Sequence, residues 1–380
     1  MAKLGDICTV VSGSTPKTGV AEYWDGTVKW ITPAELNEDS FYITDSVRHI
    51  TEYGKEKTGL SYLPKGTVIL SSRAPIGKTA IAGCEMCCNQ GFKNLICSDA
   101  IYNEYLYFFL KSKTDYLNSL GRGATFKEIS KSIVEKIEIP LPNIEKQHQI
   151  VKELKATRNL IAHRKQQLTK LDELIKARFV EMFGDCRLNP KGWVTKNLDQ
   201  VADVGSSKRV FVEELQSEGI PFYRGTEVGA LAEGKSIRPE LFITEGHYKQ
   251  LCEATGKPQK GDLLMPSICP DGRIWVVDTD APFYFKDGRV LWVHLTSQNY
   301  NPVFLLYTLK DRIMTDYESI ASGTTFAELK IFALKKCRIF DVPLSLQNQF
   351  AAFVAEVDKS KLFAELFVQS TCILAENRSK

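Results

Sequence analysis

The sequence predicts an α+β protein in which two similar mixed α/β lobes are separated by two long helices packed as an antiparallel coiled coil, with a pseudo-twofold axis. Three observations support this prediction: a heptad seam of unusual length, an internal repeat along the whole chain, and strand-like segments rich in turn residues on both sides of the seam. A length of 380 residues also favours more than one domain.

The first long helix is predicted over residues 143–184. Asn143 is a preferred N-cap type, Gly184 is a common C-terminal stop, and no Gly or Pro lies between them. At ~1.5 Å per residue, roughly 40 residues form a rod of about 60 Å, which we interpret as a spacer between two lobes. Its packing positions recur at every seventh residue: Leu154, Ile161, Leu168, Ile175 and Met182.

The other segments are divided by this helix. Residues 1–142 and 185–343 contain short apolar runs between turn residues, so each is expected to form a mixed α/β lobe. A second long helix is predicted over residues 344–380, because apolar residues again follow heptad rows. Its packing residues are expected to include Phe353, Val357, Phe367 and Leu374.

The second half of the chain repeats the first. Glu35 aligns with Glu227 at an offset of 192 residues, and the Gly-Ala-Thr-Phe segment at 123–126 aligns with Gly-Thr-Thr-Phe at 323–326, at an offset of 200. The offset grows slowly in one direction, as small insertions after a duplication would make it. If the second helix returns along the first, two similar lobes are held in inverted orientation. Dimeric DNA-binding proteins read paired half-sites with such an arrangement.

Catalytic and metal-binding motifs are incomplete. Ser72–Thr79 ends like a phosphate-binding loop but lacks its first Gly, which favours a turn that presents basic side chains. Cys84, Cys87, Cys88 and Cys97 resemble half of a zinc site; buried reduced thiols are the favoured interpretation, and zinc stays open. The spacing of the five histidines matches no hydrolase motif, and the Asn-Pro-Pro-aromatic motif of a DNA methyltransferase is missing. No catalytic residue and no metal ligand is therefore assigned.

Charge and hydropathy leave the partner open. The net charge is only +3, although a DNA-binding protein needs a local basic surface rather than a high total. The first helix is richer in basic than in acidic residues, which fits either an ordinary solvated face or a rod lying over duplex phosphates. The chain lacks a signal-peptide pattern, and its apolar runs are too short to cross a bilayer. We expect a cytoplasmic protein.

Basic and small polar residues recur in the loops of both lobes. Arg and Lys can reach guanine edges, Asn and Gln can reach adenine edges, and Ser, Thr and Lys can hold phosphates. Any single one could equally be an ordinary solvated loop residue. The candidate DNA-binding residues are Ser12, Ser14, Thr15, Lys17, Lys29, Thr32, Ser72, Arg73, Lys78, Asn89, Gln90, Lys93 and Arg122 in the first lobe, and Ser206, Ser207, Lys208, Arg209, Arg224, Arg273, Lys286 and Arg289 in the second.

An ordered set of short motifs carries a family resemblance. The set is Leu4-Gly5-Asp6-Ile7, Ser12-Gly13-Ser14-Thr15-Pro16, Arg73-Ala74-Pro75-Ile76-Gly77-Lys78, Asn89-Gln90-Gly91-Phe92, Gly123-Ala124-Thr125-Phe126, and Ile139-Pro140-Leu141-Pro142 followed by Gln147. Together these motifs resemble the specificity subunits of Type I restriction-modification systems over essentially the whole chain. The second lobe departs from the pattern, since Arg73 falls opposite Ile268 and the Asn-Gln-Gly-Phe match is lost around residues 285–288.

The resemblance implies two target-recognition domains, each of which reads one half of an asymmetric, bipartite site in double-stranded DNA. It further implies that the helices set the spacer and dock two methyltransferase subunits, and that restriction subunits can join. The chain itself would be non-catalytic and would hold no cofactor. S-adenosylmethionine for adenine methylation, and ATP with Mg²⁺ for cleavage, would belong to the partners. A coiled-coil scaffold that binds no DNA is the alternative, and a self-sufficient methyltransferase or nuclease is disfavoured by the missing motifs.

Overall fold

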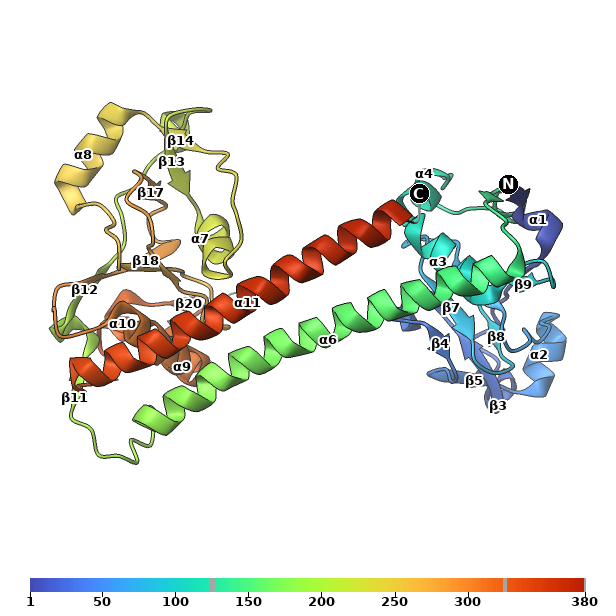
Figure 1. Ribbon diagram of the computed structural model, residues 1–380, viewed down its shortest axis with the longest axis horizontal. Coiled ribbons are helices and arrows are strands. Elements are labelled where there is room, and N and C mark those ends of the chain that lie inside the picture. The colour runs from blue at the N-terminus through green and yellow to red at the C-terminus, as the bar shows by residue number, and fades with distance from the viewer. Residues whose placement is uncertain (124–126, 324–326, 379–380) are drawn as a thin grey trace. The chain divides into compact units, whose positions relative to one another are not determined.

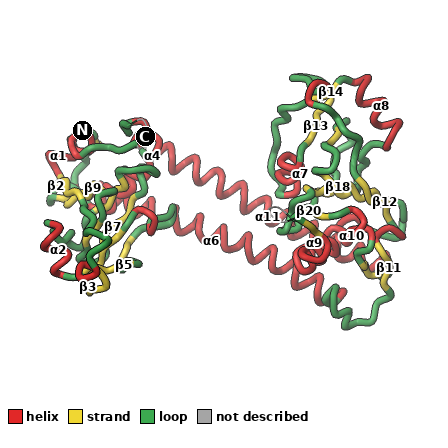
Figure 2. The backbone as a smooth tube through the Cα atoms, turned by 180° about the vertical axis from the view of Figure 1, so that it is seen from behind, coloured by secondary structure: helices red, strands yellow, loops and turns green. Residues whose placement is uncertain are grey.

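The computed structural model of the chain describes residues 1–123, 127–323 and 327–378. The chain forms two compact units, residues 1–166 with 365–380 and residues 167–364. Each unit contains one α/β lobe together with parts of two long helices, α6 (Ile144–Phe183) and α11 (Leu344–Arg378) (Figure 1). Both helices are continuous, whereas the strands are confined to the lobes (Figure 2). The α+β class with two long helices is confirmed. The repeat segments 124–126 and 324–326 lie outside the described residues.

The first lobe contains a five-stranded sheet in the order β2-β9-β6-β7-β4, a three-stranded sheet β5-β3-β8 and the pair β1-β10. Its strands are β1 (Ala2–Lys3), β2 (Cys8–Ser12), β3 (Trp24–Ile31), β4 (Tyr42–Ile43), β5 (Arg48–Ile50), β6 (Val68–Ser71), β7 (Thr79–Ala82), β8 (Cys87–Cys88), β9 (Phe92–Cys97) and β10 (Glu138–Ile139). Its helices are α1 (Leu4–Ile7), α2 (Glu52–Thr58), α3 (Asn103–Ser112), α4 (Thr114–Ser119) and α5 (Lys131–Glu135).

The second lobe contains a four-stranded sheet in the order β12-β18-β15-β16, a three-stranded sheet β14-β13-β17 and the pairs β11-β21 and β19-β20. Its strands are β11 (Thr195–Asn197), β12 (Ala202–Gly205), β13 (Ile220–Tyr223), β14 (Phe242–Ile243), β15 (Leu263–Pro266), β16 (Trp275–Val276), β17 (Tyr284–Phe285), β18 (Val290–Leu295), β19 (Ala321–Ser322), β20 (Glu328–Leu329) and β21 (Arg338–Phe340). Its helices are α7 (Gly225–Ala232), α8 (Glu245–Thr255), α9 (Pro302–Ile320) and α10 (Ile331–Lys335).

The two lobes share one topology, which confirms the internal repeat. β2-β9-β6-β7 corresponds in order and direction to β12-β18-β15-β16. In the smaller sheets β3 pairs antiparallel with β5 and parallel with β8, and β13 pairs in the same way with β14 and β17. The central strands β6 and β15 are buried along their whole length. Their short apolar runs suit strands covered on both faces.

Two glutamines explain why the repeat extends into the long helices. The Gln147 side chain accepts a hydrogen bond from the Tyr102 amide (2.8 Å) and donates to the carbonyls of Ala100 (3.0 Å) and Pro142 (2.9 Å). Gln347 makes the same three bonds in the second lobe, to Asn301, Asn299 and Val342, at 2.8, 3.0 and 2.8 Å. Both side chains are fully buried. Since each lost partner would leave a buried polar group unpaired, each glutamine joins the first turn of a long helix firmly to its lobe.

The long helices pack against each other in antiparallel directions. In the second unit Phe183 lies against Phe350, with ring centroids 5.6 Å apart, and further along the helices Asp172 pairs with Lys361 at 2.6 Å. In the first unit the guanidinium of Arg164 lies 5.1 Å from the ring of Phe367. From the first of these contacts to the third, the residue number on α6 falls while the residue number on α11 rises. The helices therefore run antiparallel, as predicted from the sequence.

The seam residues of α6 have different surroundings along the helix. Ile175 and Met182 are buried in the core of the second lobe, where Val357 of α11 joins them and Phe353 packs from the edge. Leu154, Ile161 and Leu168 are half-buried, and Phe367 is more exposed. The side chain of Leu374 lies outside the described residues.

Candidate nucleic-acid interface

Three loops of the first lobe leave the five-stranded sheet on one side, where β2 and β6 end and β9 begins. We call this side of the sheet the loop edge. Ser12 ends β2, Ser71 ends β6 and Phe92 begins β9, and the strand register places Ser12 beside Lys93 and Ser71 beside Phe92. Residues 13–17, 72–78 and 89–91 therefore form one loop cluster. Backbone bonds connect the loops: the Ser14 amide donates to the Cys88 carbonyl (3.0 Å) and the Ser72 amide to the Gly91 carbonyl (2.7 Å).

Close packing of these loops explains the Ser-Gly-Ser motif at 12–14. A Cβ atom at Gly13 would lie 2.0 Å from the Asn89 carbonyl oxygen, so no side chain fits there. The hydroxyl of the nearby Thr15 donates to the Gln90 side chain, which joins the first and third loops. The motif thus brings two loops into backbone contact, and its polar neighbours lie at the surface of the cluster.

Glu128 joins the same cluster. The backbone of Glu128 forms bridges with Arg73 and Arg122, and the Ile129 amide donates to the Ser72 carbonyl at 2.9 Å. The Glu128 carboxylate accepts from Arg73 Nε at 3.0 Å and from Lys93 Nζ at 3.1 Å. Burial opposes ionisation of Glu128, but the bonds from Lys93 and Arg73 outweigh it and lower the pKa of this carboxyl.

Several candidate side chains of the first lobe use their polar atoms within the lobe. Lys29 Nζ donates to the Thr44 carbonyl and Lys78 Nζ to the Leu36 carbonyl, both at 2.6 Å. The Thr32 hydroxyl donates to the Glu35 carboxylate at 2.9 Å, Asn89 accepts from the Gly91 amide, and Ser72 and Lys93 are buried. The candidates with exposed side chains are Ser12, Lys17, Arg73, Gln90 and Arg122, whereas Ser14 and Thr15 are half-buried.

The second lobe presents basic residues at the corresponding sheet edge. Here β12 ends at Gly205, β15 ends at Pro266 and β18 begins at Val290. The hydroxyls of Ser206 and Ser207 donate to the carbonyls of Val290 (2.7 Å) and Phe285 (2.6 Å), and so hold the loop in place. The exposed candidates of this edge are Lys208, Arg209, Lys286 and Arg289. Arg209 lies 3.7 Å from Asp287, and Arg289 pairs with Glu328.

Arg224 and Arg273 are engaged in ion pairs inside the second lobe. Arg273 pairs with Asp271 at 2.8 Å and with Glu233 at 3.5 Å. Arg224 pairs with Glu227 at 2.6 Å and with Glu240 at 3.1 Å. Glu227 also accepts from the Arg224 amide at 2.8 Å, as Glu35 accepts from the Thr32 amide at 2.7 Å in the first lobe. The aligned glutamates thus have the same capping role.

The ion pair of Glu227 predicts acid sensitivity of the second lobe. Burial opposes ionisation of Glu227, but the bonds from Arg224 outweigh it and lower its pKa from 4.5 to about 2. Because the folded-state pKa is depressed, the stabilisation is present above pH 4.5 and is lost as the pH falls toward about 2. We expect Glu227→Gln to lower the free energy of unfolding by about 2 kcal/mol at pH 7 and by much less near pH 2.

Urea unfolding of both proteins at pH 7 and at successively lower pH measures this effect. Glu240→Gln is the matched control, because Glu240 holds the same arginine from an exposed position and should change stability little. An equal loss for Glu227→Gln at every pH would show that the carboxylate charge is not what stabilises the lobe.

Many basic residues of α6 also serve the fold. Lys155 Nζ pairs with the buried carboxylate of Glu104 at 2.7 Å, and Arg158 donates to the Asp39 carbonyl at 2.6 Å. Both cations also lie near the ring of Phe41, at 5.4 and 5.0 Å. The lysines at positions 146, 152, 165, 170 and 176 have exposed side chains. A role of α6 over duplex phosphates stays a prediction for these.

The four cysteines of the zinc-like pattern have different neighbours, and Cys97, at the end of β9, pairs in register with Cys8 of β2. Cys84 lies 3.2 Å from the Thr44 carbonyl, Cys87 lies 3.7 Å from the Ser61 carbonyl, and Cys88 accepts from Asn94 at 3.0 Å. Burial raises the pKa of Cys87 to about 11 and that of Cys88 to about 12, which keeps these thiols protonated. Within the residues that the structure describes, no three His, Cys, Asp or Glu side chains form a group that could hold a metal ion.

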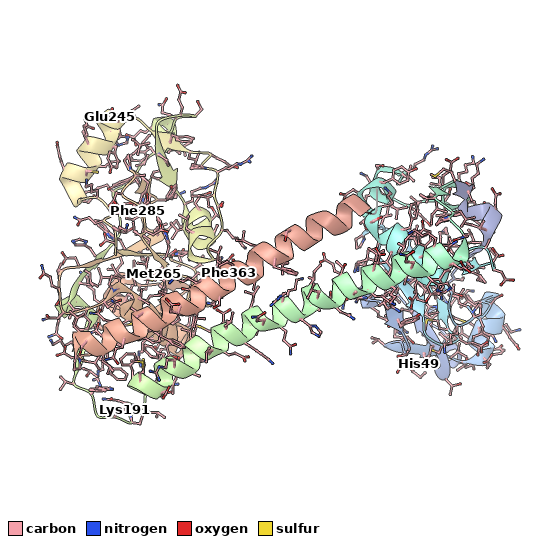
Figure 3. All side chains as sticks on the ribbon, viewed as in Figure 1. His49, Lys191, Glu245, Met265, Phe285 and Phe363 are labelled. Atoms are coloured by element: carbon pink, nitrogen blue, oxygen red, sulfur yellow. The ribbon has the colours of Figure 1, made fainter. Side chains whose placement is uncertain are left out.

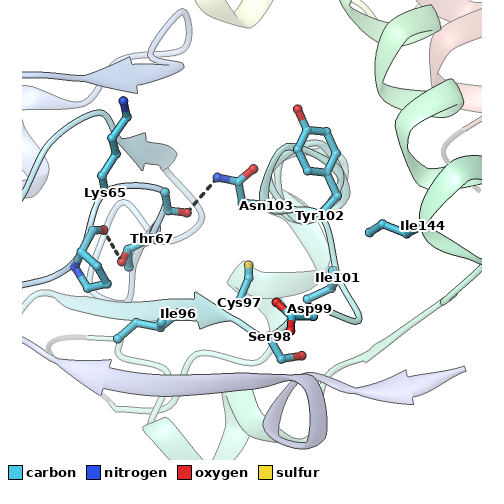
Figure 4. Close-up of a pocket in the computed structure, with 12 residues that line it drawn as sticks. Lys65, Thr67, Ile96, Cys97, Ser98, Asp99, Ile101, Tyr102, Asn103 and Ile144 are labelled. Carbon is cyan, nitrogen blue, oxygen red and sulfur yellow. Dashed lines mark hydrogen bonds between the residues drawn. The ribbon is translucent and has the colours of Figure 1, made fainter.

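A polar cavity of about 310 Å³ lies at the opposite edge of the five-stranded sheet (Figure 4). Thr67, just before β6, and Cys97, the last residue of β9, line it, and Asn103 donates to the Gly66 carbonyl at its wall (3.0 Å). The loop cluster leaves the other ends of the same strands. This cavity is therefore separate from the candidate interface.

Sequence reasoning misses three glutamates. Glu128 and Glu328 each hold a basic side chain at the loop edge, and Glu104 holds Lys155 of α6. The glutamates could have been found by asking which acidic positions recur in both halves beside basic loops.

In the described part of the chain, no helix is both long enough and apolar enough to cross a membrane.

The duplicated lobes, the basic loop edges and the two long helices define a class of DNA-recognition protein. Residues 1–173 and again residues 190–365 match the family model described as Type I restriction modification DNA specificity domain, and the chain belongs to this family. It is 32% identical over 375 residues to the Type I restriction enzyme MjaIX specificity subunit of Methanocaldococcus jannaschii, a match that covers 93% of this chain and 85% of that protein.

Other relatives agree with this membership. The EcoR124I/EcoR124II specificity subunit of Escherichia coli is 26% identical over 155 residues, which is 39% of this chain and 38% of that protein. The solved S subunit of a Type-I restriction-modification system from M. genitalium matches with a TM-score of 0.52 and 15% identity, over 100% of this chain and 94% of that chain. A chain from a study of assembly and conformational transition of the type I R-M system matches with a TM-score of 0.65 and 18% identity, over 100% and 95%. The two structures support the fold.

Proposed function

We propose that the chain is the DNA sequence-specificity subunit of a Type I restriction-modification complex, in which each lobe reads one half of a bipartite, asymmetric site. The duplication supports this proposal best, because each lobe presents basic loops at the corresponding edge of its own sheet. The loops differ in sequence between the lobes. Two lobes with the same fold but different DNA-contacting residues suit a DNA site whose two halves differ in sequence.

The base-reading and phosphate-holding residues are expected among the exposed members of the loop clusters. These are Ser12, Lys17, Arg73, Gln90 and Arg122 in the first lobe and Lys208, Arg209, Lys286 and Arg289 in the second. The side chains whose polar atoms are bonded within a lobe would shape the loops. Such a division is usual, because only part of an interface reads bases while the rest positions the protein.

The long helices would set the spacer and dock two methyltransferase subunits. α11 exposes apolar side chains that its own chain leaves uncovered, such as Phe363, which is 76% exposed (Figure 3). Exposed large apolar side chains on a helix suit a protein interface. The chain would contribute recognition and no catalysis. S-adenosylmethionine, and ATP with Mg²⁺ where restriction subunits join, would be bound by the partners.

Exchange of one lobe tests this division of labour. Replacing residues 1–142 by the first lobe of another family member is expected to change only one half of the recognised sequence. Gln147 bonds only to main-chain atoms of the lobe, so the exchange preserves this contact. The donor lobe should carry a carboxylate at the position of Glu104, because Lys155 stays in the helix.

The sequence bound by the complex with methyltransferase subunits is read by selection from random duplex DNA. The reciprocal exchange of residues 185–343 is the control and should change only the other half. A change in both halves after either exchange would contradict independent reading by the two lobes. Absence of any binding to DNA would favour the scaffold alternative.

A further inference from the structure

A carboxylate holds an exposed arginine at the loop edge of each lobe. In the first lobe Glu128 bonds Arg73 through Nε, and its second oxygen bonds the buried Lys93. In the second lobe Glu328 pairs with Arg289, and its second oxygen lies 3.8 Å from Lys330. Each site therefore combines one glutamate, one arginine and one lysine, with a net charge of +1.

The glutamates occupy the same backbone position in both lobes. The Ile129 amide, next to Glu128, donates to the Ser72 carbonyl at 2.9 Å, and the Leu329 amide, next to Glu328, donates to the Ser267 carbonyl at 2.8 Å. Glu128 is bridged by backbone to Arg122, and Glu328 to Ser322. The carboxylates thus approach the same sheet edge from the same segment.

The basic partners come from different positions. In the first lobe Ser71 at the end of β6 pairs with Phe92, and in the second lobe Pro266 at the end of β15 pairs with Val290. Ser71 therefore corresponds to Pro266 and Phe92 to Val290. By the same count Arg73 corresponds to Ile268, and Gly91 to Arg289. An inherited arginine therefore does not explain the recurrence. The two lobes have the same charge arrangement, but the arginine comes from a different loop in each lobe.

The geometry leaves the arginines able to bind a second partner. Arg73 and Arg289 side chains are 46% and 57% exposed, whereas their glutamates are about one-third exposed. Glu128 engages Nε of Arg73, which leaves its two terminal nitrogens as the face that can contact the O6 and N7 atoms of guanine. Glu328 engages the terminal Nη1 of Arg289, which leaves Nε and Nη2 of that arginine as the face for the same contact. The ionised state of Glu128, whose pKa is lowered, keeps this arrangement at neutral pH.

A carboxylate so placed also disfavours simple phosphate binding. Glu128 and Glu328 repel the DNA backbone, so an arginine that served only as a phosphate contact would bind better without them. An arginine that reads a base benefits instead, because its planar group must be held in one orientation.

We propose that Glu128 and Glu328 are positioning residues for specificity, which hold Arg73 and Arg289 in the orientation that reads a guanine in the first and the second half-site, respectively. This inference rests on the proposed function, since it names the reading arginine of each lobe. Neither glutamate would contact the base itself.

Glu128→Gln tests the inference, because the amide keeps the shape of the side chain and removes its charge. The full chain with its methyltransferase subunits is used to select duplexes from a random pool, and affinity for random DNA is measured over a range of salt. We expect discrimination at one guanine of the first half-site to fall on the order of tenfold or more. Affinity for random DNA should stay equal or rise, and the second half-site should be read as before.

Three further variants separate positioning from folding. Glu328→Gln should relax one guanine of the second half-site only. Arg73→Ala should remove the same preference as Glu128→Gln, and the double variant should lose no more than Arg73→Ala alone. Glu138→Gln, an exposed carboxylate on β10, is the control and should change nothing.

The outcomes are distinct. If the unaltered complex selects a bipartite sequence and Glu128→Gln selects it with equal discrimination, the inference fails while the proposed function stands. If Glu128→Gln weakens binding to every sequence alike and lowers the melting temperature, the glutamate is structural and the inference also fails. If the unaltered complex shows no sequence preference, the proposed function itself fails, and the inference with it.

Discussion

Insertion of four residues into α6 after Gln166 and four into α11 after Ala364 is expected to lengthen the spacer of the recognised site by about two base pairs. Four helical residues add ~6 Å of rise, and each base pair adds ~3.4 Å along duplex DNA. Both halves of the recognised sequence should stay unchanged, because no lobe residue is altered. Selection from random duplex DNA reports the spacer directly.

The two insertion points lie opposite each other along the antiparallel helices. Arg164 contacts Phe367 on one side of them, and Asp172 pairs with Lys361 on the other. Matched insertions therefore keep both contacts in register, whereas an insertion in one helix would shift them. The control places the same four residues after Lys235, in an exposed loop of the second lobe. An unchanged spacer after the helix insertions would contradict the spacer role of the helices.

Phe183→Ala is expected to lower the free energy of unfolding by about 3–5 kcal/mol, the usual cost of removing a buried phenyl ring. Phe183 is fully buried at the end of α6, and its ring lies 4.8 Å from that of Phe304 and 5.6 Å from that of Phe350, centroid to centroid. The substitution would leave a cavity where α6, α9 and the start of α11 meet. Urea unfolding followed by circular dichroism measures the loss.

Phe363→Ala supplies the matched control for this experiment. Phe363 is the same residue type on α11 and is 76% exposed, so its removal should change stability by less than about 0.5 kcal/mol. The two variants therefore separate burial from the loss of an aromatic ring. Similar small losses for both would show that the aromatic cluster does not hold the helices to the second lobe.

Local patterns made the helices and the duplication predictable from the sequence. The seven-residue spacing from Leu154 to Met182 reports helix periodicity directly, and α6 is one continuous helix. The repeat preserved the residues that shape each lobe, such as Gln147 and Gln347, whose hydrogen bonds are the same in both. A short-range pattern was sufficient for the helix, and a comparison of the two halves of the chain was sufficient for the duplication.

The roles of single loop residues could not be predicted, because their partners are distant in the sequence. Lys78 bonds the Leu36 carbonyl, 42 positions away, and Lys93 reaches Glu128 across 35. Spacing alone gives no sign that these cations are used inside the lobe. The same applies to Lys155 on α6, whose partner Glu104 lies on α3, 51 positions earlier.

Mapping of methylated adenines in host DNA, with and without this chain, shows whether the chain directs methylation to one sequence. If the chain is the specificity subunit, the host carries a methylated, asymmetric two-part sequence with an unspecified spacer of constant length, and deletion of the chain abolishes methylation of that sequence alone. An identical methylation map with and without the chain, or transfer of methyl groups by the isolated chain, would contradict the account.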